Sequence, residues 1–157
     1  MKIRVHPATI EDCDILHAFI EELARSLNLS HKMQSHPDDL RRDGFGREPK
    51  FKAIIASSVN QPVGIALYFF TYSSWAARSV LNLHDIIVSK EFRGKGVGRH
   101  LIAYLAIKAK QEECCRIDLE VRSYNQARKF YEKLGFSQDT SNLIYEIDQN
   151  QFDILSQ

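Results

Sequence analysis

The sequence predicts one α+β domain built around a single mixed β-sheet, and three observations support this prediction. Residues 51–88 contain three apolar, β-branched runs separated by turns, which is typical of antiparallel strands. Residues 96–135 alternate helical and strand-like patterns, which favours a crossover unit. The chain has 157 residues, 44% of them hydrophobic, which suits one domain with a core. The expected order over residues 1–157 is β-α-(α)-β-β-β-α-β-α-β-β.

The first part of the chain predicts one strand and two helices. Residues 2–6 (KIRVH) alternate and predict a short strand. A helix follows to about Asn28, because apolar side chains recur at helical spacing and acidic residues occupy the first turn, where the helix dipole favours them. Polar, aperiodic residues 29–36 predict a loop. Residues 37–46 predict a short helix with proline at its start and glycine near its end.

The middle of the chain predicts three strands. Residues 51–57 (FKAIIAS) are apolar and β-branched, and the following VNQPVG predicts a hairpin turn. Residues 63–73 form a long apolar run. After a turn around Trp75, residues 79–88 (SVLNLHDIIV) predict a further strand.

The last part predicts two helices, a strand and a hairpin. Residues 96–113 have an apolar face at helical spacing, and residues 115–121 (CRIDLEV) alternate as a strand does. Residues 125–135 predict a helix that ends at a glycine. Residues 136–148 predict a final β-hairpin.

Charge and cysteine content argue against several classes of function. Lys and Arg number 21 and Asp and Glu number 20, which gives no support to nucleic-acid or membrane-surface binding. No apolar run reaches the roughly 18 residues of a membrane helix, and no secretory signal is visible at the start. The cysteines, Cys13, Cys114 and Cys115, form no C-x-x-C pair. We therefore expect a cytoplasmic protein without metal, disulfide or membrane partner.

A glycine-rich basic loop, residues 93–99 (RGKGVGR), follows the third of the central strands. Glycine lets backbone N–H groups approach a ligand, and a helix N-terminus attracts anions, so the loop predicts a phosphate site. The P-loop motif is absent, and the dinucleotide motif fails because position 99 is arginine. The pattern that fits is R-x-x-G-x-G, formed by Arg93, Gly96 and Gly98. The alternative is a tight basic turn without a ligand.

This motif resembles that of the GNAT superfamily of acetyl-CoA-dependent N-acetyltransferases, in which the same segment wraps the pyrophosphate of coenzyme A. Residues 127–136 (ARKFYEKLGF) are similar to the family's C-terminal motif. Residues 40–51 (LRRDGFGREPKF) and 68–75 (YFFTYSSW) are similar to the diamine (spermidine/spermine) N-acetyltransferase branch. With residues 8–24 included, the resemblance covers nearly the whole chain and implies a GNAT-like sheet flanked by helices.

The resemblance implies direct transfer of acetyl from acetyl-CoA, as co-substrate and without metal, to a primary amine. It places the oxyanion donor and the pantetheine contact on the backbone of residues 86–88, and it makes Tyr131 the proton donor to the departing thiolate. The family's coenzyme A-binding asparagine would fall on Tyr124, so the candidate is the neighbouring Asn125, unless the contact is lost. The expected coenzyme A-binding residues are Ile86, Ile87, Val88, Arg93, Gly94, Lys95, Gly96, Val97, Gly98, Arg99 and Asn125.

The expected amine pocket departs from the diamine branch. Ser73 stands where the branch has an acid, and His84 stands where it has glutamate. Fewer carboxylates mean weaker selection of a polycation, so we expect a smaller or less cationic amine, such as an amino acid-like amine or a small diamine. An aromatic side chain at Trp75 offers a face to a cation. The predicted substrate-binding residues are Phe45, Tyr72, Ser73, Trp75 and Asp85.

His84 has three interpretations. It is a general base, acting directly or through water, because a histidine titrates near neutral pH. Alternatively, it shapes the substrate pocket, or it is an ordinary strand histidine that is hydrogen-bonded to Asp85.

Two alternative functions stay open at this point. One is acetylation of protein N-termini or lysines. The other is coenzyme A binding without catalysis, against which the retained Tyr131 argues. The partner is expected to be a small-molecule amine rather than a nucleic acid, and a homodimer is expected from the resemblance alone.

Overall fold

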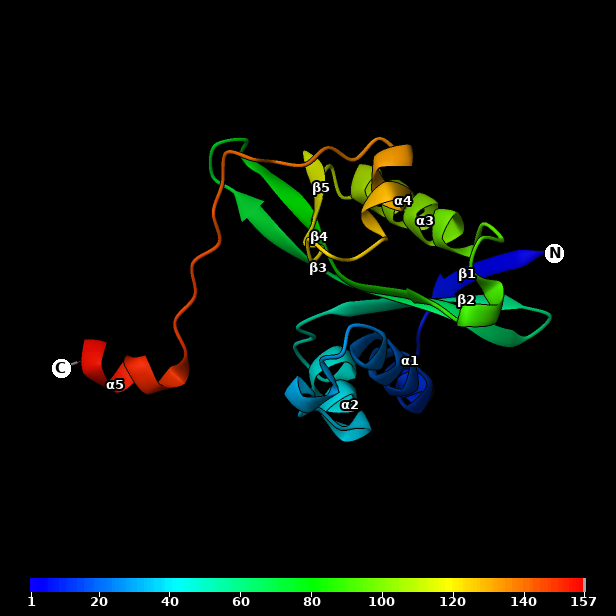
Figure 1. Cartoon of the computed structure of the whole chain (residues 1–157), viewed down its shortest axis with the longest axis horizontal. Coiled ribbons are helices and arrows are strands. Elements are labelled where there is room, and N and C mark those ends of the chain that lie inside the picture. Colours follow the sequence, from blue (N-terminus) through cyan, green and yellow to red (C-terminus); the bar gives the residue numbers. More distant parts are fainter. Residues whose placement is uncertain (157) are drawn as a thin grey trace. The chain divides into compact units, whose positions relative to one another are not determined.

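A computed structural model describes residues 1–156, and the chain divides into two units, Met1–Asn125 and the residues from Gln126 onward. The first unit holds a five-stranded sheet of order β1-β2-β3-β4-β5 (Figure 1). Strands β1 to β4 pair with one another in antiparallel fashion, and β5 pairs with β4 in parallel. The strands are β1 (Ile3–Pro7), β2 (Lys52–Ser58), β3 (Gln61–Ser73), β4 (Arg78–Val88) and β5 (Arg116–Leu119).

Helices cover both faces of this sheet. Two of them, α1 (Cys13–Ser26) and α2 (Pro37–Phe45), lie on one face, and α3 (Val97–Gln111) lies on the other (Figure 1). Short 3₁₀ turns at Ile10–Asp12, Ser30–Lys32 and Lys90–Phe92 join these elements to the strands and loops. The mixed sheet with helices on both faces confirms the predicted α+β class, while the prediction of one domain over residues 1–157 stays a prediction.

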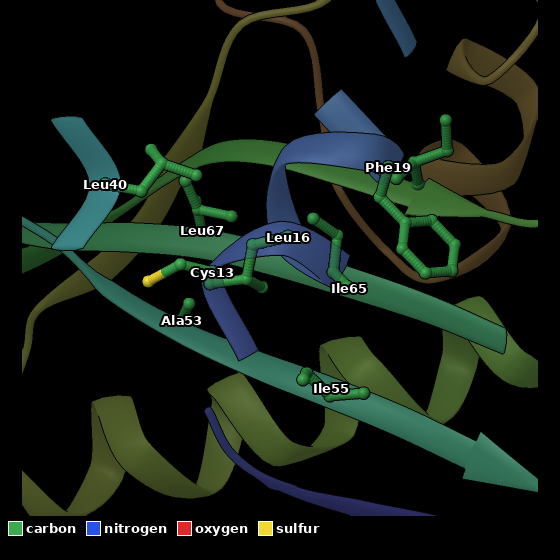
Figure 2. Close-up of a cluster of buried hydrophobic side chains, with 9 residues drawn as sticks. Cys13, Leu16, Phe19, Leu40, Ala53, Ile55, Ile65 and Leu67 are labelled. Carbon is green, nitrogen blue, oxygen red and sulfur yellow. The ribbon is translucent and has the colours of Figure 1, made fainter. Parts of the chain in front are cut away.

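The apolar periodicity of α1 fixes that helix to the sheet. Its buried side chains Cys13, Leu16 and Phe19 pack with Leu40 of α2 against strands β2, β3 and β4 (Figure 2). The sheet contributes Ala53, Ile55, Ile65, Leu67 and Ile87 to this cluster. The face of the sheet that carries α1 is called the α1 face below.

The second unit differs from the prediction for residues 136–148. It contains α4 (Arg128–Lys133), a 3₁₀ turn at Gln149–Gln151 and α5 (Phe152–Leu155), but no strand within its described residues. The expected hairpin is therefore wrong for this structure. Residues 137–148 are exposed, and a two-stranded hairpin without a covering layer is marginally stable in water. The Asp139 carboxylate instead accepts a hydrogen bond from the Ser141 backbone N–H at 2.8 Å, which favours a local turn.

The turn between β2 and β3 predicts a stabilising substitution. Val59 and Asn60 have φ values of 48° and 63°, and Val59 is 93% exposed. A β-branched residue is strained in this left-handed region, whereas asparagine tolerates it. We expect Val59→Asn to raise the free energy of unfolding by about 1 kcal/mol, measured by urea denaturation. An unchanged or lower urea midpoint would show that the turn is not strained.

Candidate functional site

Strand β4 separates from β5 halfway along its length. The two strands pair only over residues 80–83 of β4 and 116–119 of β5. The following residues of β4, Asp85–Val88, pair with β3 on one side and with no strand of residues 1–156 on the other. The backbone of Ile86, Ile87 and Val88 therefore borders a split in the sheet, as an extended ligand that pairs with a strand would require.

The glycine loop lies directly after this split and leads into α3. Gly94 and Gly96 have φ values of 73° and 84°, and Gly96 caps the helix that Val97 begins. Apart from the adjacent residues, no atom lies within 4 Å of a Cβ added to either glycine, so the backbone there is open to a ligand. The first N–H groups of a helix have no intrahelical partner, and with the exposed side chains of Lys95 and Arg99 they suit a pyrophosphate.

Two predicted loop residues make contacts of their own. The Arg93 side chain donates from Nε to the Val88 carbonyl oxygen at 3.0 Å, and its Nη2 lies 3.7 Å from Glu22 Oε1 of α1. Arg93 thus ties the loop to the end of β4 and to α1. Gly98 lies in the first turn of α3 and is half-buried.

A β-bulge lies at His84, just before the split. Leu67 of β3 pairs with Asp85, and the next residue of β3 pairs with Leu83, so His84 has no partner opposite it. Asp85 lies opposite Leu67 and therefore on the α1 face, and the His84 ring lies 6.1 Å from that of Phe69, which shares the face of Leu67. The bulge brings two consecutive side chains to the same face, which regular alternation forbids.

His84 and Asp85 are hydrogen-bonded. His84 Nδ1 lies 3.0 Å from Asp85 Oδ2, and the two side chains are 67% and 20% exposed. Because an ionised carboxylate only accepts, the proton is on Nδ1, and Nε2 is the free basic nitrogen. The hydrogen bond with Asp85 raises the pKa of His84, although partial desolvation of the ring acts in the opposite direction. The arrangement is that of a base held by an orienting carboxylate.

The residues predicted at the end of β3 do not all reach this pair. Ser73 is half-buried and shares the face of Phe69 by strand alternation, whereas Tyr72 points to the opposite face and is 69% exposed. Trp75 is fully exposed in the turn after β3. Of these three, only Ser73 shares a face with His84.

Phe45 lines a cavity that does not include the His84–Asp85 pair. It ends α2, packs against the cluster of Figure 2, and lines a cavity of about 230 Å³ at the start of β2. Other walls of that cavity are Phe51, Tyr68 and Tyr104. The lining includes neither His84 nor Asp85.

Tyr124 and Asn125 follow β5. The Tyr124 hydroxyl lies 3.5 Å from the carbonyl oxygen of Leu27 at the end of α1, and the Asn125 backbone N–H donates to the Arg122 carbonyl oxygen at 2.8 Å. The segment after β5 thus contacts the C-terminal end of α1.

Tyr131 belongs to the second unit. It lies in α4, is 8% exposed, and its ring packs 5.3 Å from that of Phe130 and 5.7 Å from that of Phe136. Burial raises the pKa of Tyr131 to about 12. Its hydroxyl therefore holds its proton throughout the neutral range, as a proton donor must.

The structure also contains an open polar hollow that the sequence patterns did not predict. A cavity of about 460 Å³ lies beside the second half of α1 and the loop that follows. His17, Glu21 and Arg25 of α1 line it, spaced four residues apart. That spacing is the only signal in the sequence, and it is equally typical of a solvated helix face.

Residues 1–156 contain no group of three or more His, Cys, Asp or Glu side chains placed to hold a metal ion. Over the same residues, no helix combines the length and the apolar character that a membrane crossing requires. Cys13, Cys114 and Cys115 are free thiols.

Comparison with known proteins gives a consistent result. Residues 16–136 match the Acetyltransferase (GNAT) family. A thialysine N-epsilon-acetyltransferase of Mus musculus is 36% identical over 141 residues, which cover 84% of this chain and 82% of that protein. The human spermidine/spermine N(1)-acetyltransferase-like protein 1 is 34% identical over 79% of this chain and 19% of its own length. An integron cassette protein from V. cholerae superposes with a TM-score of 0.81 at 28% identity, covering 99% of this chain and 98% of that one.

Proposed function

Because this chain belongs to the GNAT family of acetyltransferases, we propose that it transfers acetyl from acetyl-CoA directly to the primary amine of a small molecule, which is less cationic than spermidine. The observation that carries the proposal is the split between β4 and β5, bordered by a histidine–carboxylate pair on one side and an open glycine loop on the other. In the proposal, an extended pantetheine arm lies in this split, with the thioester toward the His84–Asp85 pair and the pyrophosphate at the glycine loop.

Coenzyme A would bind along this split. In the proposal, the backbone of Gly94, Gly96 and Gly98 and the first turn of α3 hold the pyrophosphate, while Lys95 and Arg99 supply positive charge. The backbone of residues 86–88 pairs with the pantetheine arm and donates to the oxyanion. The open backbone at both left-handed glycines supports this assignment, and Val97 and Asn125 complete the set.

The glycine loop predicts a specific loss of affinity for acetyl-CoA. Gly96→Val forces a β-branched residue into a φ of 84° and distorts the backbone that would hold the pyrophosphate. We expect the KM for acetyl-CoA to rise about tenfold or more, with kcat at saturation close to that of the wild type. Asn60→Val introduces similar strain at a φ of 63° in the β2–β3 turn and should leave this KM unchanged. Equal KM values for all three proteins would remove the loop from the binding site.

Acetyl transfer requires two proton movements. A lysine-type amine has a pKa of about 10.4 and must lose a proton before it attacks the thioester carbon. In the proposal, His84 Nε2 takes that proton, directly or through water, while Asp85 holds the imidazole. A C–N bond forms and the C–S bond breaks, and the Tyr131 hydroxyl donates its proton to the departing thiolate. The Nδ1–carboxylate hydrogen bond and the raised pKa of Tyr131 support these roles.

The acceptor is proposed from charge and from relatives. Asp85 is the carboxylate on β4, and the positions filled by Ser73 and His84 carry no negative charge. A thialysine N-epsilon-acetyltransferase is among the similar proteins, so thialysine is our first test substrate. We also propose that the whole chain acts as one N-acetyltransferase domain and that it works in the cytoplasm. We further propose that it is a homodimer, and light scattering of the purified protein would test this oligomeric state.

Product analysis tests the proposal against its alternatives. The protein is incubated with acetyl-CoA and, separately, thialysine, spermidine and a lysine-containing peptide, and the products are identified by mass spectrometry. We expect N-acetylated thialysine. Acetylation of the peptide alone would favour a protein acetyltransferase, and coenzyme A binding without any acetylated amine would favour a non-catalytic module.

A further inference from the structure

Glu120 borders the split in the sheet on the side of β5. The last pair of residues that joins the two strands is Leu83 of β4 with Leu119 of β5, and the strands separate after it. The next residue along β4 is His84, and the next residue after β5 is Glu120. Because the two strands are parallel, His84 and Glu120 stand on opposite borders of the split at the point where it begins.

The side chains of these two residues belong to the same face of the sheet. Asp118 of β5 pairs with Asn82, which in turn pairs with Phe69 on the α1 face. Side chains alternate along a strand, so Glu120 shares the face of Asp118, two residues before it. The His84 ring is also on this face, 6.1 Å from the ring of Phe69. Glu120 and His84 therefore face the same side across the start of the split.

The charge of Glu120 acts on the imidazole. The hydrogen bond with Asp85 is the largest cause that raises the pKa of His84, and the negative charges of Asp85 and Glu120 act in the same direction. Within residues 1–156, these two carboxylates are the charged groups that act on the ring. An effect of one charge on another weakens with distance, so it agrees with a position of Glu120 opposite His84.

Glu120 is also the carboxylate that stays available to a ligand. The Asp85 carboxylate is hydrogen-bonded to His84. The Asp118 carboxylate accepts from Arg116 Nε, at 2.9 Å to Oδ1 and 3.0 Å to Oδ2. Glu120 is exposed, and within residues 1–156 its carboxylate makes no hydrogen bond or salt bridge. An exposed negative charge thus lies beside the proposed base without a protein partner.

We propose that Glu120 binds the ammonium form of the reacting amine and holds it beside His84 Nε2. A lysine-type amine has a pKa of about 10.4 and therefore arrives charged at neutral pH. A carboxylate holds an ammonium by charge-assisted hydrogen bonds. One N–H proton then passes to His84 Nε2, and the lone pair that it leaves on nitrogen forms the C–N bond. Glu120 is thus a substrate-binding residue and not the base, an inference that rests on the proposed acetyltransferase function.

A matched set of variants tests this role. With the amine of highest kcat/KM, thialysine in our expectation, Glu120→Gln should raise the KM for the amine about tenfold or more. The kcat and the KM for acetyl-CoA should change little, because the base and the glycine loop are intact. Glu120→Asp keeps the charge and should restore most of the affinity. Glu112→Gln removes an exposed glutamate at the end of α3 and should behave as the wild type.

An uncharged analogue of the amine separates charge from shape. S-(2-hydroxyethyl)cysteine carries a hydroxyl where thialysine carries its side-chain ammonium, and the corresponding alcohol serves for any other amine. Its inhibition constant against the amine should be equal in the wild type and in Glu120→Gln, because it brings no positive charge to position 120. A rise in this constant that matches the rise in KM would overturn the inference, since the substitution would then have altered the shape of the pocket.

The pH–rate profile gives a second readout. Loss of the Glu120 charge removes one cause that raises the pKa of His84, so the acidic limb should move to lower pH in Glu120→Gln. The shift should be smaller than in Asp85→Asn, because the Asp85 hydrogen bond is the largest cause. An acidic limb that disappears together with kcat in Glu120→Gln would overturn the inference, since Glu120 would then be the base.

The outcomes also separate the inference from the function on which it rests. An unchanged KM for the amine in Glu120→Gln would overturn the role of Glu120 and leave acetyl transfer intact. A wild-type protein that acetylates no amine at all would overturn the proposed function itself.

Discussion

Tyr131→Phe is expected to lower kcat by about a hundredfold or more, because the departing thiolate would lose its proton donor. The KM for acetyl-CoA should change little, since phenylalanine keeps the ring that packs against Phe130 and Phe136. With a pKa of about 12, the tyrosine keeps its proton over the whole working range, so the effect should be the same from neutral to mildly alkaline pH. Steady-state thiol release measures both constants.

Tyr145→Phe is the control for this prediction. Tyr145 is 88% exposed in the same unit, so loss of its hydroxyl should leave kcat and KM unchanged. A near-normal kcat for Tyr131→Phe would remove Tyr131 from the mechanism. Reduced thermal stability with an unchanged kcat would make the residue a core side chain only.

The second large effect concerns pH. If His84 Nε2 accepts the proton of the amine, only the neutral imidazole is active, so the rate falls as pH decreases through the pKa of His84. The Asp85 hydrogen bond raises that pKa, and the acidic limb of kcat/KM should therefore lie above the usual histidine value of about 6.5. His84→Ala should lower the rate about a hundredfold and flatten this limb.

The Asp85→Asn variant tests in which direction the acidic limb of the pH–rate profile moves. Removing the carboxylate removes the main cause that raises the pKa of His84, so the acidic limb should move to lower pH. The rate at the plateau should also fall, because the imidazole loses its orienting partner. If the acidic limb is unchanged in both His84→Ala and Asp85→Asn, His84 is not the base. It then either shapes the substrate pocket or is an ordinary strand histidine that is hydrogen-bonded to Asp85.

Most of the first unit could be predicted from the sequence because its elements have strong periodicity. The apolar spacing of α1 predicts a helix with one buried face, and the β-branched run of residues 51–57 predicts the strand β2 against which that face packs. The glycine loop was equally predictable, since Gly94 and Gly96 adopt the left-handed φ values for which glycine is suited.

Other features depend on contacts that a linear pattern does not carry. The bulge at His84 arises from the register between β3 and β4, and without it His84 and Asp85 would point to opposite faces. The loop after α1 is tied to that helix by the bond from His17 to the Ser35 carbonyl, eighteen positions away. Residues 136–148 predicted a β-hairpin, but a stable hairpin also requires a covering layer or a further paired strand, which the sequence pattern does not provide.

Amine-dependent thiol release from acetyl-CoA tests the central claim most directly. Purified protein, acetyl-CoA and a panel of thialysine, lysine, putrescine and spermidine are combined, and kcat/KM is measured for each amine. The account predicts release that requires an amine, with thialysine a better acceptor than spermidine. Spermidine as the best acceptor would contradict the proposed loss of polycation selectivity, and release at the same rate without any amine would contradict acetyl transfer to an amine altogether.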